Sequence, residues 1–139
     1  MHLTFMPFRL TAAKELGALL ATLAHPHRLL IVKELQTADR DVKSLVAALG
    51  LPQPVISQHL NRLRLVHLVK ERRENRHAYY RLSDPLVATW LDQGFELIMN
   101  EAARSQAVAE ASSKARLVWS NPAQAAPCYK SNKDEGSIR

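Results

Sequence analysis

The sequence is poor in cysteine, since Cys128 is the only one among its 139 residues. A single cysteine excludes an intrachain disulfide framework and any zinc site built from several thiolates. We therefore expect a cytoplasmic protein with one hydrophobic core. Cys128 is a candidate redox-sensitive residue. Because the chain offers no second cysteine to resolve an oxidised thiol, we favour the alternative of an inert exposed side chain.

Glycine is also scarce, and the four present form no phosphate-binding loop. We find no nucleophile beside a suitable base and no clustered ligand set, so we predict no enzyme activity and no cofactor. Long hydrophobic runs are missing as well. The apolar stretch Leu16 to Ala24 is short and has helical spacing, which favours an amphipathic helix over a signal or membrane segment. We expect no membrane partner.

Positive charge is concentrated in one segment of the chain. Between His59 and Arg81 there are seven lysines and arginines against two acidic residues, whereas the remainder holds twelve basic against eleven acidic residues. Nearly the whole formal net charge of +6 therefore lies in this segment. A localised cationic surface of this kind releases counterions from a phosphate backbone, which indicates double-stranded DNA as the partner.

The residues before this basic segment, and those at its start, show sequence features typical of helices. The leucine spacing predicts a first helix over about 11–24, and Pro26 suits the first turn of a second. Asp41 is a plausible N-cap for a third helix, and Gly50 a plausible left-handed residue ending it. A fourth helix over about 52–66 then opens with prolines in its first turn. This pair of short helices around Gly50 predicts a helix-turn-helix.

The fourth helix has one apolar face and one polar face. Its polar face carries no acidic residue, which suits insertion in the major groove. Amides can pair with adenine edges, and a guanidinium with guanine or phosphate. The candidate DNA-binding residues of this helix are Gln53, Ser57, Gln58, Asn61 and Arg62. An ordinary solvated helix face is the alternative, and we favour DNA contact.

A basic hairpin follows over 68–82, with Asn75 where a tight turn tolerates a positive φ. Arg73 and Arg76 near its tip could reach phosphates or the minor groove, and the alternative is a charged hairpin that only protects a sheet edge. The predicted fold is therefore mainly α with a small β-hairpin, a winged helix-turn-helix.

The C-terminal part divides into a helix and a tail. From Asp84, a plausible N-cap, a long helix is predicted to about Ser112. Its apolar residues form more than one stripe, so one stripe needs a partner. We predict a DNA-binding and dimerisation domain over 1–112 and a flexible tail over 113–139, where polar residues, proline and glycine dominate.

Three stretches of the chain together resemble the ArsR/SmtB family of bacterial winged-helix repressors. They are residues 23–29 (LAHPHRL), residues 50–60 (GLPQPVISQHL) and the predicted wing, residues 68–82. The resemblance implies a homodimer through the first and last helices that binds an inverted-repeat operator and represses transcription. The predicted dimer residues are Leu16, Leu19, Leu20, Leu23, Trp90, Leu91, Leu97 and Ile98. A winged-helix protein-interaction module with only non-specific DNA affinity is the alternative function.

The ligand positions of metal-sensing members are not matched. Asp41 and Lys43 stand where such members carry a Cys-x-Cys pair, and Leu86 stands at a histidine position of the last helix. We therefore predict no metal site. The candidate effector is an unidentified small molecule or an oxidant, and the alternative is constitutive DNA binding with no effector. His25 and His27, which flank Pro26, fit the start of a helix better than a ligand pair, and His59 is expected to be mainly structural.

Overall fold

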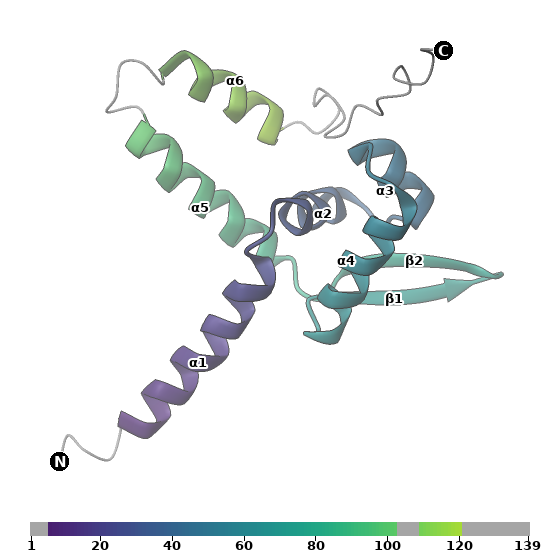
Figure 1. Cartoon of the computed structure of the whole chain (residues 1–139), viewed down its shortest axis with the longest axis horizontal. Helices are drawn as coiled ribbons and strands as arrows, with labels where there is room; N and C mark the ends of the chain where they lie inside the picture. Colours follow the sequence, from purple (N-terminus) through teal and green to yellow (C-terminus); the bar gives the residue numbers. More distant parts are fainter. Residues whose placement is uncertain (1–5, 103–108, 121–139) are drawn as a thin grey trace, which may run out of the picture.

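The computed structural model describes residues 6–102 and 109–120. Along the chain the elements are α1 (Met6–Leu23), α2 (Pro26–Thr37), α3 (Val42–Leu49), α4 (Gln53–Leu65), β1 (Val69–Glu74), β2 (His77–Leu82), α5 (Leu86–Ala102) and α6 (Ala109–Ser120) (Figure 1). This arrangement confirms the predicted mainly helical fold with one small antiparallel hairpin. Within these residues, no helix is both long and apolar enough to span a bilayer.

The hydrophobic core lies where α2, α3 and α4 pack together over the start of the hairpin. Its largest fully buried side chains come from all four elements: Ile31, Val32, Leu45, Ile56, Leu60, Leu63 and Val69. Removing an aliphatic side chain of this size from water contributes about 1.5–3 kcal/mol. The three helices and β1 are therefore held as one packed body.

The turn between α3 and α4 follows the local signals of the sequence. The Asp41 carboxylate accepts a hydrogen bond from the Ser44 backbone N–H at 2.7 Å, which confirms the N-cap. Gly50 ends α3 with φ 66°, and its N–H donates to the Val46 carbonyl at 2.8 Å. A left-handed φ of this kind costs glycine little. Leu51 then fills the core between the helices, so the turn angle is fixed by packing.

Helix α4 runs from Gln53 to Leu65, one residue shorter at each end than the predicted 52–66. Pro52 stands at the N-cap, where it makes no side-chain hydrogen bond, and Pro54 lies in the first turn. Both prolines occupy positions where a missing backbone N–H breaks no helical hydrogen bond.

Strands β1 and β2 form an antiparallel hairpin, the wing, in which Val69 pairs with Leu82 and Glu74 with His77. The two-residue turn between them has φ 48° at Asn75, as expected, and φ 69° at Arg76. A bridge joins the wing to the loop before α3, because the backbones of Arg40 and Tyr80 exchange two hydrogen bonds of 3.0 and 2.8 Å.

The C-terminal helices differ from the prediction of one helix to about Ser112. Helix α5 ends at Ala102, and residues 113–120, assigned to a flexible tail, lie in α6. Trp119 explains why this segment is ordered: its ring stacks on Phe95 with centroids 4.7 Å apart, and its indole N–H donates to Asp92 at 3.1 Å. Asp92 also pairs with Lys33, which ties α5 to α2. Cys128 lies outside the described residues.

Candidate DNA-binding surface

The outer face of α4 carries all five of its predicted DNA-binding side chains. Gln53, Ser57, Gln58, Asn61 and Arg62 are exposed, whereas the opposite face of the helix is buried in the core. No acidic residue occurs in α4. The buried face fixes the rotation of the helix, so its polar and cationic groups are all held outward.

The wing lies beside α4 and is attached to it. The Leu68 backbone N–H donates to the Leu63 carbonyl at 3.0 Å, at the junction of helix and strand. Further along, the guanidinium of Arg64 on α4 pairs with Glu71 on β1. Figure 1 shows α4 crossing the base of the hairpin at an angle, with the tip of the hairpin projecting beyond the helix. Helix and wing therefore present one continuous surface.

Several cations of this segment are neutralised by acidic neighbours. Arg73 lies 3.3 Å from Glu71, measured from its Nε to a carboxylate oxygen. Arg72 contacts both Glu74 and Asp39, and the hydrogen bond to Glu74 raises the pKa of the Arg72 guanidinium. These surface pairs are weak individually, but they lower the charge available to a polyanion.

Arg62 and Arg76 differ from the paired arginines. Both are exposed, and in the part of the chain that the structure describes neither has a carboxylate within salt-bridge distance. Arg62 lies on α4 and Arg76 in the wing turn. Of the predicted cations, these two are the ones with full charge available for phosphate.

The predicted dimer residues divide into two groups. Leu16, Leu20, Trp90, Leu97 and Ile98 are exposed, between 36% and 73%. Leu19 and Leu91 are half-buried against the core, and Leu23 is 2% exposed within it. Leu23 packs inside its own chain because α1 folds onto α2 at that point, so we remove it from the predicted dimer surface.

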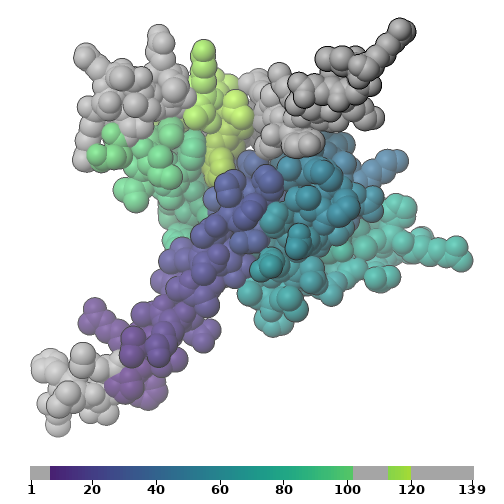
Figure 2. Space-filling view, in the orientation of Figure 1, coloured from purple at the N-terminus to yellow at the C-terminus, as the bar shows by residue number. Residues whose placement is uncertain are grey.

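An apolar groove runs between α1 and α5. It has a volume of about 380 Å³ and is lined by Leu16, Leu19, Leu68, Leu86, Val87 and Trp90, among others. Figure 2 shows α1, in purple, extending away from the body of the molecule, on the side opposite the wing. The predicted dimer residues that are exposed thus lie on α1 and α5, whereas Leu65 and Val66 leave apolar surface exposed at the C-terminal end of α4.

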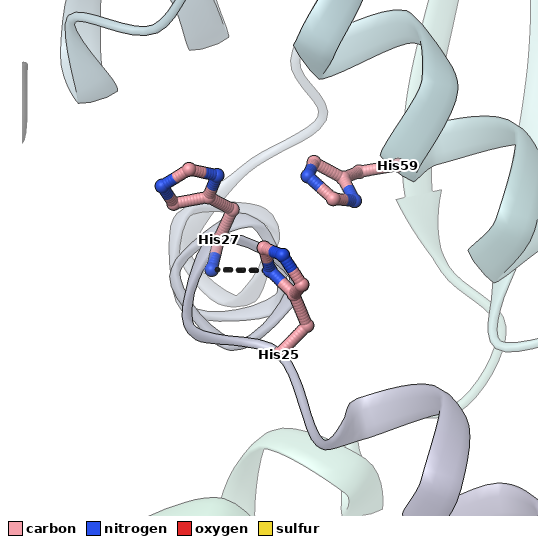
Figure 3. Close-up of side chains that lie close together, drawn as sticks. All are labelled: His25, His27 and His59. Carbon is pink, nitrogen blue, oxygen red and sulfur yellow. Dashed lines mark hydrogen bonds between the residues drawn. The ribbon is translucent and has the colours of Figure 1, made fainter.

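Three histidines from two helices lie together behind the polar face of α4 (Figure 3). His25 and His27 flank the start of α2, and His59 lies on α4. Ring centroids are 4.5 Å apart for His25 and His59, 5.0 Å for His25 and His27, and 5.5 Å for His27 and His59. One nitrogen of each ring lies within 4.8 Å of the others. We name these three residues the histidine cluster.

Hydrogen bonds and burial define the state of this cluster. Nδ1 of His25 accepts from the His27 backbone N–H at 3.2 Å and caps α2. Burial, followed by the charges of neighbouring histidines and arginines, lowers the pKa of His59 to about 4. Burial and nearby Arg28 also lower the pKa of His25. The His59 ring is therefore neutral at neutral pH.

The sequence analysis interpreted these histidines separately and missed their proximity. His27 and His59 are 32 positions apart in the sequence, and no motif spacing links them. The helical phase of α4 did place His59 beside the buried face, as the structure bears out with 7% exposure. The pairing of that face with the start of α2 is a property of tertiary packing.

Comparison with known proteins gives three consistent likenesses. The family described as "Bacterial regulatory protein, arsR family" matches residues 25–71. The transcriptional repressor SmtB of Mycobacterium tuberculosis is 46% identical over 68 residues, which cover 49% of this chain and 50% of SmtB. The chain thus spans about half the length of that relative.

Two further likenesses cover more of the related protein. The biofilm growth-associated repressor of Agrobacterium fabrum is 39% identical over 80 residues, 58% of this chain and 68% of that protein. The crystal structure of the transcriptional repressor BigR from Xylella fastidiosa superposes with a TM-score of 0.58 at 30% identity, covering 69% of this chain and 95% of BigR. With its helix-turn-helix, wing and these likenesses, the chain belongs to the ArsR family of bacterial regulatory proteins.

Proposed function

We propose that this protein is a homodimeric transcriptional repressor that binds an inverted-repeat operator with α4 in the major groove and the wing on phosphates or the minor groove. The observation that carries the proposal is the continuous surface of α4 and wing, in which an acid-free helix face adjoins unpaired cations. Groups of these kinds read base edges and bind phosphate, respectively. The relatives SmtB and BigR, named as transcriptional repressors, support the same function.

The residues of this surface fall into two groups, one that reads the base sequence and one that contributes affinity for the phosphate backbone. Gln53, Gln58 and Asn61 carry amides, whose paired donor and acceptor match the adenine edge. Ser57 can reach a base or a phosphate, and Arg62 a guanine or a phosphate. Arg76 and Arg73 extend the contact along the backbone, with Arg73 weakened by its pairing to Glu71. We expect the amides to set specificity and the arginines to set salt dependence.

Dimerisation fits the exposed apolar residues of α1 and α5. Five of them, Leu16, Leu20, Trp90, Leu97 and Ile98, leave large apolar side chains in water in the single chain. Burial between two copies would remove this cost and place two α4 helices for the two arms of an inverted repeat. A small-molecule or oxidant effector, and a redox role for Cys128, stay predictions.

The test is fluorescence anisotropy of the full chain on a duplex from upstream of its own gene, at several salt concentrations. Arg62→Ala is expected to weaken binding by about 1–3 kcal/mol, and to reduce the salt slope by about one if the contact is a phosphate. Arg9→Ala is the matched control, because it removes the same charge from an exposed position on α1.

Equal losses in the Arg62 and Arg9 variants would contradict the assignment of the surface. Gln58→Ala adds a second criterion: it should reduce discrimination between operator and scrambled duplex while leaving the salt slope unchanged. Weak binding to every duplex tested would instead favour the protein-interaction module.

A further inference from the structure

The histidine cluster brings three imidazoles from two helices around one point. Figure 3 shows the rings of His25 and His27, from the start of α2, facing the ring of His59 on α4. Imidazole nitrogen is a preferred ligand for zinc, nickel and copper, whereas calcium and magnesium prefer oxygen. We propose that His25, His27 and His59 bind one divalent transition-metal ion, with Zn²⁺ as the reference ion.

The spacing of the nitrogens is close to that of a metal site. Zinc–nitrogen bonds of about 2.0–2.1 Å in tetrahedral geometry place ligand nitrogens about 3.4 Å apart, and one nitrogen of each ring is already within 4.8 Å of the others. The remaining gap of little more than an ångström is within the reach of side-chain rotation. Three protein ligands leave a fourth position for water, as in open zinc sites.

Two existing contacts identify the ligand atoms. Nδ1 of His25 accepts from the His27 backbone N–H, and Nδ1 of His59 lies 3.4 Å from Nη1 of Arg28. Because Nδ1 of each ring faces one of these neighbours, we assign Nε2 as the ligand atom of both rings. A neutral imidazole that ligates through Nε2 carries its proton on Nδ1, where it no longer accepts. Metal binding must therefore open both contacts.

The surroundings set limits on affinity. Arg28 and Arg62 bring positive charge near the cluster and oppose a dication. Arg28 also donates a hydrogen bond to the Thr22 carbonyl. This contact limits how far its guanidinium can move from the cluster when a metal ion binds. The affinity is therefore expected to be lower than for a closed four-ligand zinc site. Because His59 belongs to α4, an occupied site would join α4 to the start of α2.

The test is a titration of the metal-free full chain with Zn²⁺ in competition with a chromophoric chelator. We expect one equivalent bound per chain, and at least about tenfold weaker binding for His27→Gln. His27 is the residue of choice because its side chain neither caps α2 nor fills the core. The matched control is the double variant His67→Asn with His77→Gln. It removes two exposed histidines, one just after α4 and one in the wing, and leaves the histidine cluster unchanged.

Two further measurements separate ligation from folding and locate the ion. Zn²⁺ should raise the Tm of the wild-type protein and of the control variant, but not that of His27→Gln, whose Tm without metal should be unchanged. The backbone amide NMR signal of His27 should shift on Zn²⁺ addition, because its acceptor is lost. Equal affinity of the wild-type protein and His27→Gln, or loss of binding in the control variant, would overturn the proposal. The experiment uses no DNA and is independent of the proposed function.

Discussion

The segment from α2 to β2 and the helices α1 and α5 use leucine in opposite ways. In the first, Leu45, Leu60 and Leu63 are at most 1% exposed, and all three belong to the hydrophobic core. In the second, Leu16, Leu20 and Leu97 are between 46% and 73% exposed. The first region is therefore stabilised by its own chain, whereas the second has apolar surface that the described residues leave uncovered.

A leucine-to-alanine substitution should change the free energy of unfolding far more in the first region than in the second, and this is the largest effect that we expect. Leu60→Ala is expected to lower the free energy of unfolding by about 2–5 kcal/mol, because it leaves a cavity in the core. Leu97→Ala should cost less than about 0.5 kcal/mol in the monomer, because Leu97 is exposed. Urea denaturation at several protein concentrations measures both.

Protein concentration sharpens this comparison. The cost of Leu97→Ala should grow as concentration rises and the dimer forms, whereas that of Leu60→Ala should not depend on the partner. A concentration-independent cost for Leu97→Ala would remove this residue from the proposed dimer surface.

A double substitution on α1 should separate the subunits without unfolding the first region. Leu16→Glu with Leu20→Glu removes two apolar side chains worth about 1.5–3 kcal/mol each if fully buried. We expect the dimer dissociation constant to rise by at least about a hundredfold, as measured by analytical ultracentrifugation. Leu65→Glu is the matched control, since Leu65 is 69% exposed at the end of α4. Dimers of equal stability in both variants would contradict the α1 assignment.

The N-cap of α3 tests how far local signals stabilise the first region. Asp41→Ala removes the acceptor for the Ser44 N–H and should lower the free energy of unfolding by about 1 kcal/mol. Hydrogen bonds from Ser44 lower the pKa of the Asp41 carboxyl in the folded protein. This stabilisation should therefore be complete above pH 4 and be lost as pH falls through the lowered folded-state pKa.

Acid denaturation followed by circular dichroism checks the sign. The Asp41→Ala variant should show a smaller loss of stability than the wild-type protein below pH 4, since the titrating group is gone. A parallel loss in both proteins would mean that the carboxylate of Asp41 contributes nothing that depends on pH.

The smallest expected effects concern the two helical glycines of the second region. Among the described residues, a Cβ at Gly17 or Gly94 would meet no atom within 4 Å other than those of its chain neighbours and its own helix backbone. Gly94→Ala should therefore stabilise the monomer by up to about 1 kcal/mol through helix propensity. Gly94 lies one turn from Trp90 and Ile98 on α5, so a measured weakening of the dimer would indicate close helix approach there. Gly17→Ala on α1 provides the companion measurement.

Local signals in the sequence predicted much of the first region. Asp41, Gly50 and Asn75 act within a few residues of themselves, so cap, helix end and hairpin turn followed from residue type. The polar face of α4 followed from helical periodicity. Arg76 in the turn did not, because a positive φ is unusual for arginine and is imposed here by the tight hairpin.

Tertiary contacts account for what the sequence left unpredicted. The order of residues 113–120 depends on Trp119 meeting Phe95 and Asp92, which lie on a different helix. The ion pair of Arg73 is formed with Glu71, which lies two residues earlier on the same strand and also pairs with Arg64. The burial of Leu23 depends on the angle at which α1 meets α2. Of these, only the Glu71–Arg73 pair has a signature in residue spacing, because residues i and i+2 lie on the same face of a strand.

The backbone bridge between Arg40 and Tyr80 has a consequence for the length of the DNA site. It joins β2 to the loop before α3, while the Leu68 and Arg64 contacts join α4 to β1, so we expect α4 and the wing to move together. Under the proposed function, neither can shift separately along the duplex to accommodate an altered spacer. Inserting one base pair between the two arms of the operator should therefore displace α4 and the wing of one subunit together. Any binding to the lengthened operator would then require a change at the proposed dimer contacts of α1 and α5.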